Sequence, residues 1–226
     1  MPDNSSADAP EPARLDGVPL DELVSAARQL LRDKAVSEFD PPIRLASGQL
    51  SRFFIDGKAG LAHAADLRLA CRTLHRLVEA AGIEWDAVGG LTLGADHLAV
   101  GMALAADRQW FFVRKEPKDR GTGRQIEGAA IGAGTRVVAV EDVVSTGGSL
   151  FKAIDVIEAT GATVVAAVTL IDRGGGAGEM LAGRNIPYLH IAAHADLGLP
   201  PVASAAALAE SVGVAVDTGP GSGAGA

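Results

Sequence analysis

An apolar segment that runs directly into two acidic residues and a turn of small residues is the feature that most constrains the fold. Val137–Val140 is apolar and mostly β-branched, which predicts a buried strand of a parallel sheet. Glu141 and Asp142 stand where this strand is expected to end. Ser, Thr and Gly fill positions 145–149, and Leu150–Thr160 has the pattern of a helix. The stretch therefore predicts a strand, a tight turn and a helix N-terminus in succession.

A turn of this composition is suited to binding a phosphate group. Glycines let the backbone approach closely, free N–H groups of the first helical turn point at the anion, and the helix dipole favours negative charge. Acidic residues beside such a pocket would repel a phosphate unless they bind hydroxyl groups or a metal ion. A sugar phosphate offers hydroxyls and phosphate together. The alternative is an ordinary strand-to-helix turn with Asp142 as the N-cap residue, but the adjacent Glu141 favours the sugar-phosphate site.

The rest of the chain alternates between strand and helix patterns. We expect strands at 87–91, 110–114, 135–141, 163–171 and 188–192, with helices between them. This order predicts an α/β fold with a doubly wound, mostly parallel sheet. Before it come a helix near 20–31, a β-hairpin around Ser47-Gly48, and a helix over 67–78. Ligands in such sheets bind beyond the carboxyl ends of the strands.

One domain accounts for most of the 226 residues. We expect residues 1–17 to be a disordered leader, 18–215 the domain, and 216–226 a disordered Gly/Ser/Ala tail, with a short helix or strand at 205–212. No signal peptide and no apolar run of about 18 residues is present. The single cysteine, Cys71, fits a reducing compartment. These features predict a cytoplasmic protein that does not span a membrane.

The net charge of −8, from 20 basic and 28 acidic residues, argues against a nucleic-acid-binding surface. An anionic ligand must therefore be bound by cations that are concentrated locally. Residues 114–128 provide such a concentration in a long, glycine-containing loop, with Arg114, Lys115, Lys118, Arg120 and Arg124. A mobile basic loop could close over a charged leaving group and exclude water. The alternative is an ordinary solvated loop.

Three further features have both a functional and a structural interpretation. The turn at 89–97 could bind a second phosphate, or simply pack a strand tightly against a helix. Arg173 could pair with a substrate carboxylate, or form a surface pair with Asp172. Phe53 and Phe54 could stack on a planar base, or belong to the core. The five histidines show no metal-ligand spacing, and no protein nucleophile is evident.

Together these motifs resemble those of the orotate phosphoribosyltransferases, members of the type I phosphoribosyltransferase class. The resemblance covers roughly residues 18–195. It rests on the Arg-Lys-x-x-Lys loop, the acidic pair with its small-residue turn, the hairpin segment 47–58, and Asp172-Arg173. The acidic turn marks the type I class, and the lysine loop is specific to the orotate enzymes. The resemblance implies a type I fold with a small N-terminal hairpin and helix hood and a flexible lid loop.

The resemblance also implies a reaction, which is the Mg²⁺-dependent transfer of a 5-phosphoribosyl group from phosphoribosyl pyrophosphate to orotate. The products are orotidine 5′-monophosphate and pyrophosphate, on the route to UMP. It implies a homodimer whose lid reaches the neighbouring site, and Mg²⁺ held by the substrate rather than directly by protein side chains. The catalytic residues it implies are Arg114, Lys115, Lys118 and Arg120. These four would bind phosphoribosyl pyrophosphate together with Glu141, Asp142, Val143, Val144, Ser145, Thr146, Gly147, Gly148 and Ser149. Orotate would contact Ser145, Arg173, Phe53, Phe54 and Lys58.

Two positions depart from the family pattern. Arg120 stands where the family often has His, and a guanidinium stabilises charge but does not donate a proton near neutral pH. Ala46 stands where many members have Lys, so one orotate contact is either missing or supplied elsewhere, with Lys58 and Arg44 as the candidates. A phosphoribosyltransferase for a purine base, and a regulator that senses phosphoribosyl pyrophosphate, remain alternatives.

Overall fold

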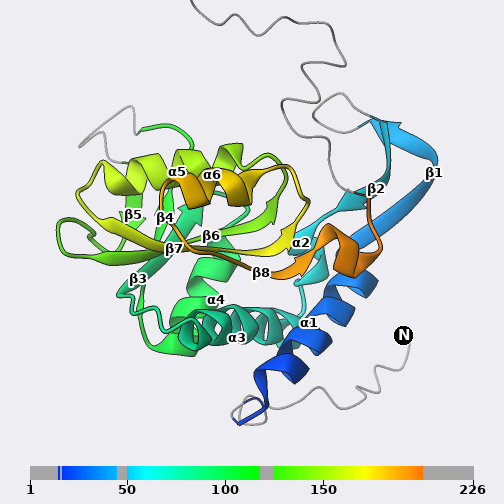
Figure 1. Ribbon diagram of the computed structural model, residues 1–226, viewed down its shortest axis with the longest axis horizontal. Helices are drawn as coiled ribbons and strands as arrows, with labels where there is room; N and C mark the ends of the chain where they lie inside the picture. The colour runs from blue at the N-terminus through cyan, green and yellow to red at the C-terminus, as the bar shows by residue number, and fades with distance from the viewer. Residues whose placement is uncertain (1–14, 16, 45–49, 118–124, 201–226) are drawn as a thin grey trace, which may run out of the picture.

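The computed structural model describes residues 15, 17–44, 50–117 and 125–200, and its centre is a six-stranded sheet (Figure 1). The strand order is β5-β4-β3-β6-β7-β8, and all neighbours are parallel except β4 and β5. The strands are β3 Ala87–Leu91, β4 Gln109–Val113, β5 Ile126–Gly128, β6 Arg136–Val144, β7 Thr163–Asp172 and β8 Tyr188–Ala193. The predicted α/β fold with a mostly parallel sheet is confirmed.

Helices cover both faces of the sheet (Figure 1). On one face lie α1 Leu20–Lys34, α3 Ala64–Ala80 and α4 Asp96–Ala106, and on the other α5 Gly148–Glu158 and α6 Ala177–Gly183. The short elements are α2 Gly57–Gly60 and the 3₁₀ helix η2 His194–Leu197. None of the helices in the described ranges is long and apolar enough to cross a membrane.

The central position of β6 in the sheet explains why its sequence is almost entirely apolar before the two acids. Val137 to Val140 are completely buried, because alternate side chains enter the two cores on opposite faces of the sheet. Val138 and Val140 pack with α3 and α4, while Val137 and Ala139 pack with α5. A strand covered on both sides has no polar face, so it reads as a continuous apolar run.

The expected hairpin forms a separate two-stranded sheet that projects from the main body (Figure 1). Its strands are β1 Val36–Arg44 and β2 Leu50–Ile55, which are antiparallel. Pro41 and Pro42 lie inside β1, in the segment where the pairing register shifts between Glu38 and Ile43. Proline is compatible with an edge strand at such an irregularity, because no ladder hydrogen bond is required of its nitrogen.

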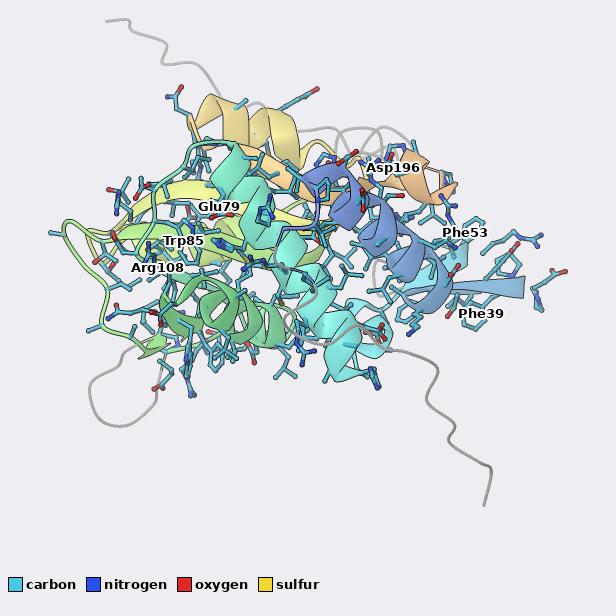
Figure 2. All side chains as sticks on the ribbon, turned by 90° about the horizontal axis from the view of Figure 1, so that it is seen from below. Phe39, Phe53, Glu79, Trp85, Arg108 and Asp196 are labelled. Atoms are coloured by element: carbon cyan, nitrogen blue, oxygen red, sulfur yellow. The ribbon has the colours of Figure 1, made fainter. Side chains whose placement is uncertain are left out.

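Helix α1 connects this hairpin to β8 and the 3₁₀ helix η2. The Arg28 Nη2 atom lies 3.1 Å from Asp196 Oδ2, and Arg28 Nε donates to the Ile191 carbonyl. Figure 2 shows Phe39 and Phe53 at the hairpin end of the molecule, opposite Glu79, Trp85 and Arg108. Helix α1 therefore attaches the hood to β8 and η2.

Several boundaries differ from the sequence-based expectation. Strand β6 continues to Val144 because Val143 and Val144 pair with the end of β7, so the two acids lie within the strand rather than at its end. Strand β5 was not expected, because it is short and follows a polar segment. The short elements α2, α6 and η2 were also missed.

Some predictions concern residues outside the described ranges. These are the turn at Ser47-Gly48, the lid residues Lys118, Arg120 and Arg124, the segment 205–212 and most of both tails. The proposed domain boundaries stay predictions.

Gly90 provides a test of how tightly β3 packs against β6. A Cβ atom at Gly90 would lie 2.0 Å from the Val140 carbonyl oxygen and 2.6 Å from Ala95 Cβ. Gly90→Ala should therefore lower the free energy of unfolding by about 1–3 kcal/mol, the usual cost of overpacking. Chemical denaturation measures the effect.

Gly183→Ala is the matched control, since an added Cβ at this α6 residue meets no atom within 4 Å. It should leave stability unchanged or raise it by up to about 1 kcal/mol, because Ala favours a helix over Gly. Equal effects of the two substitutions would contradict the close approach of β3 and β6.

Candidate active site

The turn between β6 and α5 forms a cavity of about 300 Å³ at the carboxyl edge of the sheet. Gly147 adopts φ 86°, and a Cβ there would lie 2.7 Å from the Phe151 ring, so only glycine suits this position. No side chain caps the N-terminus of α5, which leaves first-turn N–H groups for an anion. The cavity is lined by Glu141 and Val143–Leu150, which include every residue predicted for the turn.

Glu141 and Asp142 are both buried, with exposed fractions of 5% and 9%. The Val143 N–H donates to Asp142 Oδ1 at 2.8 Å, and the Asp142 N–H lies 3.2 Å from Glu141 Oε1. Burial, and then repulsion by Asp142, raise the pKa of Glu141 to about 8. Glu141 is therefore mainly protonated at neutral pH, and a ligand that needs its carboxylate must displace a proton.

Lys58 approaches this pair from the hood. Its Nζ atom lies 3.4 Å from Asp142 Oδ2 and 3.3 Å from Asp56 Oδ1. Asp56 also caps α2 by accepting the N–H groups of Lys58 and Ala59. The structure thus brings a predicted orotate-binding residue into contact with a predicted ribose-binding one.

The turn between β3 and α4 lies against the same acids. A Cβ atom at Gly94 would lie 2.6 Å from Glu141 Oε1 and 2.8 Å from Asp142 Oδ1. Helix α4 also lacks a side-chain cap, so its first turn can offer N–H groups to a second anion. The turn is therefore tightly packed against β6 and also presents first-turn N–H groups beside the two acids.

The first turn of α4 carries two polar side chains that the sequence analysis did not single out. Asp96 Oδ1 and His97 Nε2 are buried and have no hydrogen-bond partner among the described residues. Burial raises the pKa of Asp96 and lowers that of His97. The sequence feature that could have identified them is an acidic residue and a histidine directly after a glycine turn.

The loop after β7 packs against the turn between β6 and α5, which forms the phosphate cradle. Gly175 packs so closely that a Cβ atom would lie 2.1 Å from the Ser145 carbonyl oxygen. The Arg173 N–H donates to the Val144 carbonyl at 2.8 Å, which joins this loop to the end of β6. The two loops therefore form one continuous wall.

Arg173 itself is buried, with an exposed fraction of 7%, which excludes the surface-pair interpretation. Its Nε atom has no hydrogen-bond partner in the described part of the chain, and burial lowers its pKa. Asp172 instead accepts the Gly174 N–H at 2.9 Å. A buried guanidinium whose Nε atom has no partner among the described residues favours an anionic ligand.

Both ends of the basic loop are fixed to each other. The Arg114 N–H donates to the Gln125 carbonyl at 2.8 Å, and Gln125 Nε2 lies 3.3 Å from the Arg114 carbonyl. Lys115 is exposed to solvent, while Arg114 Nη1 lies 3.6 Å from Glu127 Oε1. The predicted cations Lys118 and Arg120 lie outside the described residues, so the structure places only the loop base.

The two hairpin aromatics have different environments. Phe53 is partly buried against the core, whereas Phe54 is 43% exposed. Successive residues of a strand face opposite sides, which accounts for the difference. Phe53 fits the structural interpretation, and Phe54 is the one available for a ligand.

The carboxyl ends of β3, β6 and β7 thus bring together a phosphate cradle, two acids and a buried arginine, with Lys58 above them. Such a site can hold the phosphate and the hydroxyl groups of one sugar phosphate, with an additional anion at Arg173.

Comparison with known proteins agrees with this geometry. Residues 61–200 match the phosphoribosyl transferase domain family. The orotate phosphoribosyltransferase of Pyrococcus furiosus is 41% identical over 137 residues, which cover 61% of this chain and 75% of that protein. That of Corynebacterium glutamicum strain R is 37% identical over 175 residues, covering 76% and 91%.

A solved structure gives the same result. The Mycobacterium tuberculosis orotate phosphoribosyltransferase in complex with phosphoribosyl pyrophosphate aligns with a TM-score of 0.66 and 31% identity, over 78% of this chain and 99% of that one. The resemblance expected from the sequence motifs is confirmed. The chain belongs to the phosphoribosyltransferase family, within the group of orotate phosphoribosyltransferases.

Proposed function

We propose that the protein transfers the 5-phosphoribosyl group of phosphoribosyl pyrophosphate to N1 of orotate, giving orotidine 5′-monophosphate and pyrophosphate. The observation that carries this proposal is the meeting of a phosphate cradle, a buried acid pair and a buried arginine at one sheet edge. Relatives that cover about three quarters of this chain include orotate phosphoribosyltransferases, one of which was solved with phosphoribosyl pyrophosphate.

The sugar phosphate has a natural position in this site. Its 5′-phosphate accepts N–H groups from the turn at 145–149, and its ribose hydroxyls donate to Glu141 and Asp142. Glu141 accepts such hydrogen bonds best as a carboxylate, so binding requires the loss of its proton. The acids fix the ribose while the bond at C1 is exchanged.

Orotate binds next to the ribose through its own carboxylate. The buried Arg173 provides a fixed pair of donors, and Ser145 lies on the adjoining loop. Phe54 and Lys58 approach from the hood. Ionised orotate is itself the nucleophile, so N1 forms a bond to C1 as the bond from C1 to pyrophosphate breaks, and no protein nucleophile is required.

Pyrophosphate departure requires positive charge at the other side of C1. The turn with Gly94 offers N–H groups there, and Arg114 and Lys115 begin the basic loop. We assign Lys118 and Arg120 to the same role, and place the loop over a neighbouring subunit's site in a homodimer. Leu93, which lies in this turn and is 73% exposed, supports an apolar contact there.

Magnesium is proposed as the metal, bound mainly by the substrate. The buried acids Glu141 and Asp142 lie close to the Gly94 turn, and this negative charge suits a substrate that carries Mg²⁺. These residues would face the ribose hydroxyls that accompany it. When bound, the ion neutralises charge on the leaving pyrophosphate.

The base specificity tests the proposed function. Pyrophosphate release should depend on orotate and Mg²⁺, and should be absent with adenine, xanthine or uracil, because none of these bases carries the carboxylate that Arg173 would bind. Ultraviolet absorbance follows the loss of free orotate. Turnover with a purine and not with orotate would refute the assignment.

Lys115→Ala tests the role of the basic loop. Loss of one charge-stabilising donor should reduce turnover by a factor of about 10² or more. Lys34→Ala should leave turnover unchanged, because Lys34 pairs with Asp66 away from the site. Near-normal turnover of the Lys115 variant would rule out the lid assignment.

The pH dependence of substrate binding tests the acid pair. Because burial raises the pKa of Glu141 to about 8, the ligand-free protein holds this proton up to that pH. Binding that requires the carboxylate must release it, so affinity should increase by about tenfold per pH unit between pH 6 and 7 and less steeply as the pH approaches 8. Calorimetric titration with phosphoribosyl pyrophosphate measures both the affinity and the proton released.

Glu141→Gln is the control for this pH dependence, since phosphate groups of the ligand also titrate near pH 6. The variant should bind more weakly but lose the additional slope. An unchanged slope in Glu141→Gln would show that the pH dependence originates elsewhere.

A further inference from the structure

Lys58 lies between two carboxylates and holds neither tightly. Its Nζ atom is 3.3 Å from Asp56 Oδ1 and 3.4 Å from Asp142 Oδ2. Strong hydrogen bonds between an ammonium and a carboxylate are shorter, at about 2.7–2.9 Å. The Lys58 side chain is 51% exposed, whereas that of Asp142 is 13% exposed. The ammonium can therefore move to another acceptor at little cost.

The backbone under Lys58 is fixed, so any movement is confined to its side chain. Asp56 accepts the N–H groups of Lys58 and Ala59, and its own N–H donates to the Ala35 carbonyl. Gly57 packs directly on β6, because a Cβ there would lie 3.2 Å from Asp142 Cβ. The range of the ammonium is thus limited to the surroundings of Asp142.

Lys58 is also the charge that balances Asp142 in the ligand-free protein. Among the described residues it is the one cation within 4 Å of that carboxylate. His97 faces the same group, but burial lowers its pKa and favours the neutral imidazole. A buried carboxylate that loses its ion-pair partner must gain other donors.

Ribose hydroxyls are such donors, and orotate carries a third carboxylate. We propose that Lys58 couples the two substrates, moving from Asp142 to the orotate carboxylate once ribose hydroxyls bind Asp142. The sugar phosphate then strengthens orotate binding, and orotate strengthens sugar-phosphate binding by the same factor. This inference rests on the proposed function and adds to it a residue that couples the binding of the two substrates.

Ribose 5-phosphate is the probe for this coupling, since it carries the hydroxyls and the phosphate but has no pyrophosphate to transfer. Orotate is titrated calorimetrically into the protein with and without saturating ribose 5-phosphate, in the absence of Mg²⁺. A buffer at pH 8.5, above the raised pKa of Glu141, reduces the proton release that accompanies binding. The wild-type dissociation constant for orotate should fall by about tenfold when ribose 5-phosphate is present, within the usual range of coupling.

Two substitutions distinguish coupling through Lys58 from coupling by direct contact between the two ligands. In Lys58→Met, orotate should bind weakly and ribose 5-phosphate should change its dissociation constant by less than about twofold, since the coupling group is absent. In Asp142→Asn, orotate should bind the ligand-free protein about as tightly as it binds the loaded wild type. Lys34→Met is the matched control, because it removes a lysine from the Lys34–Asp66 pair, and should keep the full coupling.

A Lys58→Met variant that keeps the tenfold effect would overturn the proposal, as would a wild type without coupling. Orotate turnover with Mg²⁺ and phosphoribosyl pyrophosphate, measured on the same preparation, separates the two claims. Turnover without coupling refutes only this inference, whereas absence of both turnover and orotate binding refutes the proposed function.

Discussion

The burial of two adjacent carboxylates in the central strand is the constraint on which the rest of the site depends. Glu141 and Asp142 are less than one-tenth exposed, although each is expensive to bury as a charge. In the ligand-free protein Glu141 is held largely as its acid, and Asp142 faces Lys58. The pair is therefore prepared for a ligand that supplies hydrogen-bond donors, which the ribose of a sugar phosphate does.

Close backbone approach at a few glycines brings the other groups to these acids. Gly94 places the β3–α4 turn beside both carboxylates, Gly57 places α2 against Asp142, and Gly175 joins the loop after β7 to Ser145. Each position leaves no room for a Cβ without displacement. The chemistry of the site follows from the sheet order, because the carboxyl ends of neighbouring parallel strands meet at one edge.

The sequence was sufficient for those parts that depend on local pattern. The apolar run before Glu141 identified the central strand, and the small-residue turn identified the phosphate cradle. The extension of β6 to Val144 could not be predicted, because it depends on pairing with β7. The contact of Lys58 with Asp142 spans 84 residues of sequence and exists only through the packing of α2 on β6. The buried polar atoms of the first turn of α4 are likewise a result of tertiary packing.

The protonation of Glu141 is the most direct test of the account, since the geometry assigns this carboxyl a proton without ligand and a charge with ligand. Carbon-13 NMR of protein labelled at the glutamate carboxyl carbon, assigned by comparison with Glu141→Gln, measures its titration. We expect a pKa of about 8 in the ligand-free protein and a clear decrease when ribose 5-phosphate is saturating. An ordinary glutamate pKa near 4.5 in the ligand-free protein, unchanged by the ligand, would contradict it.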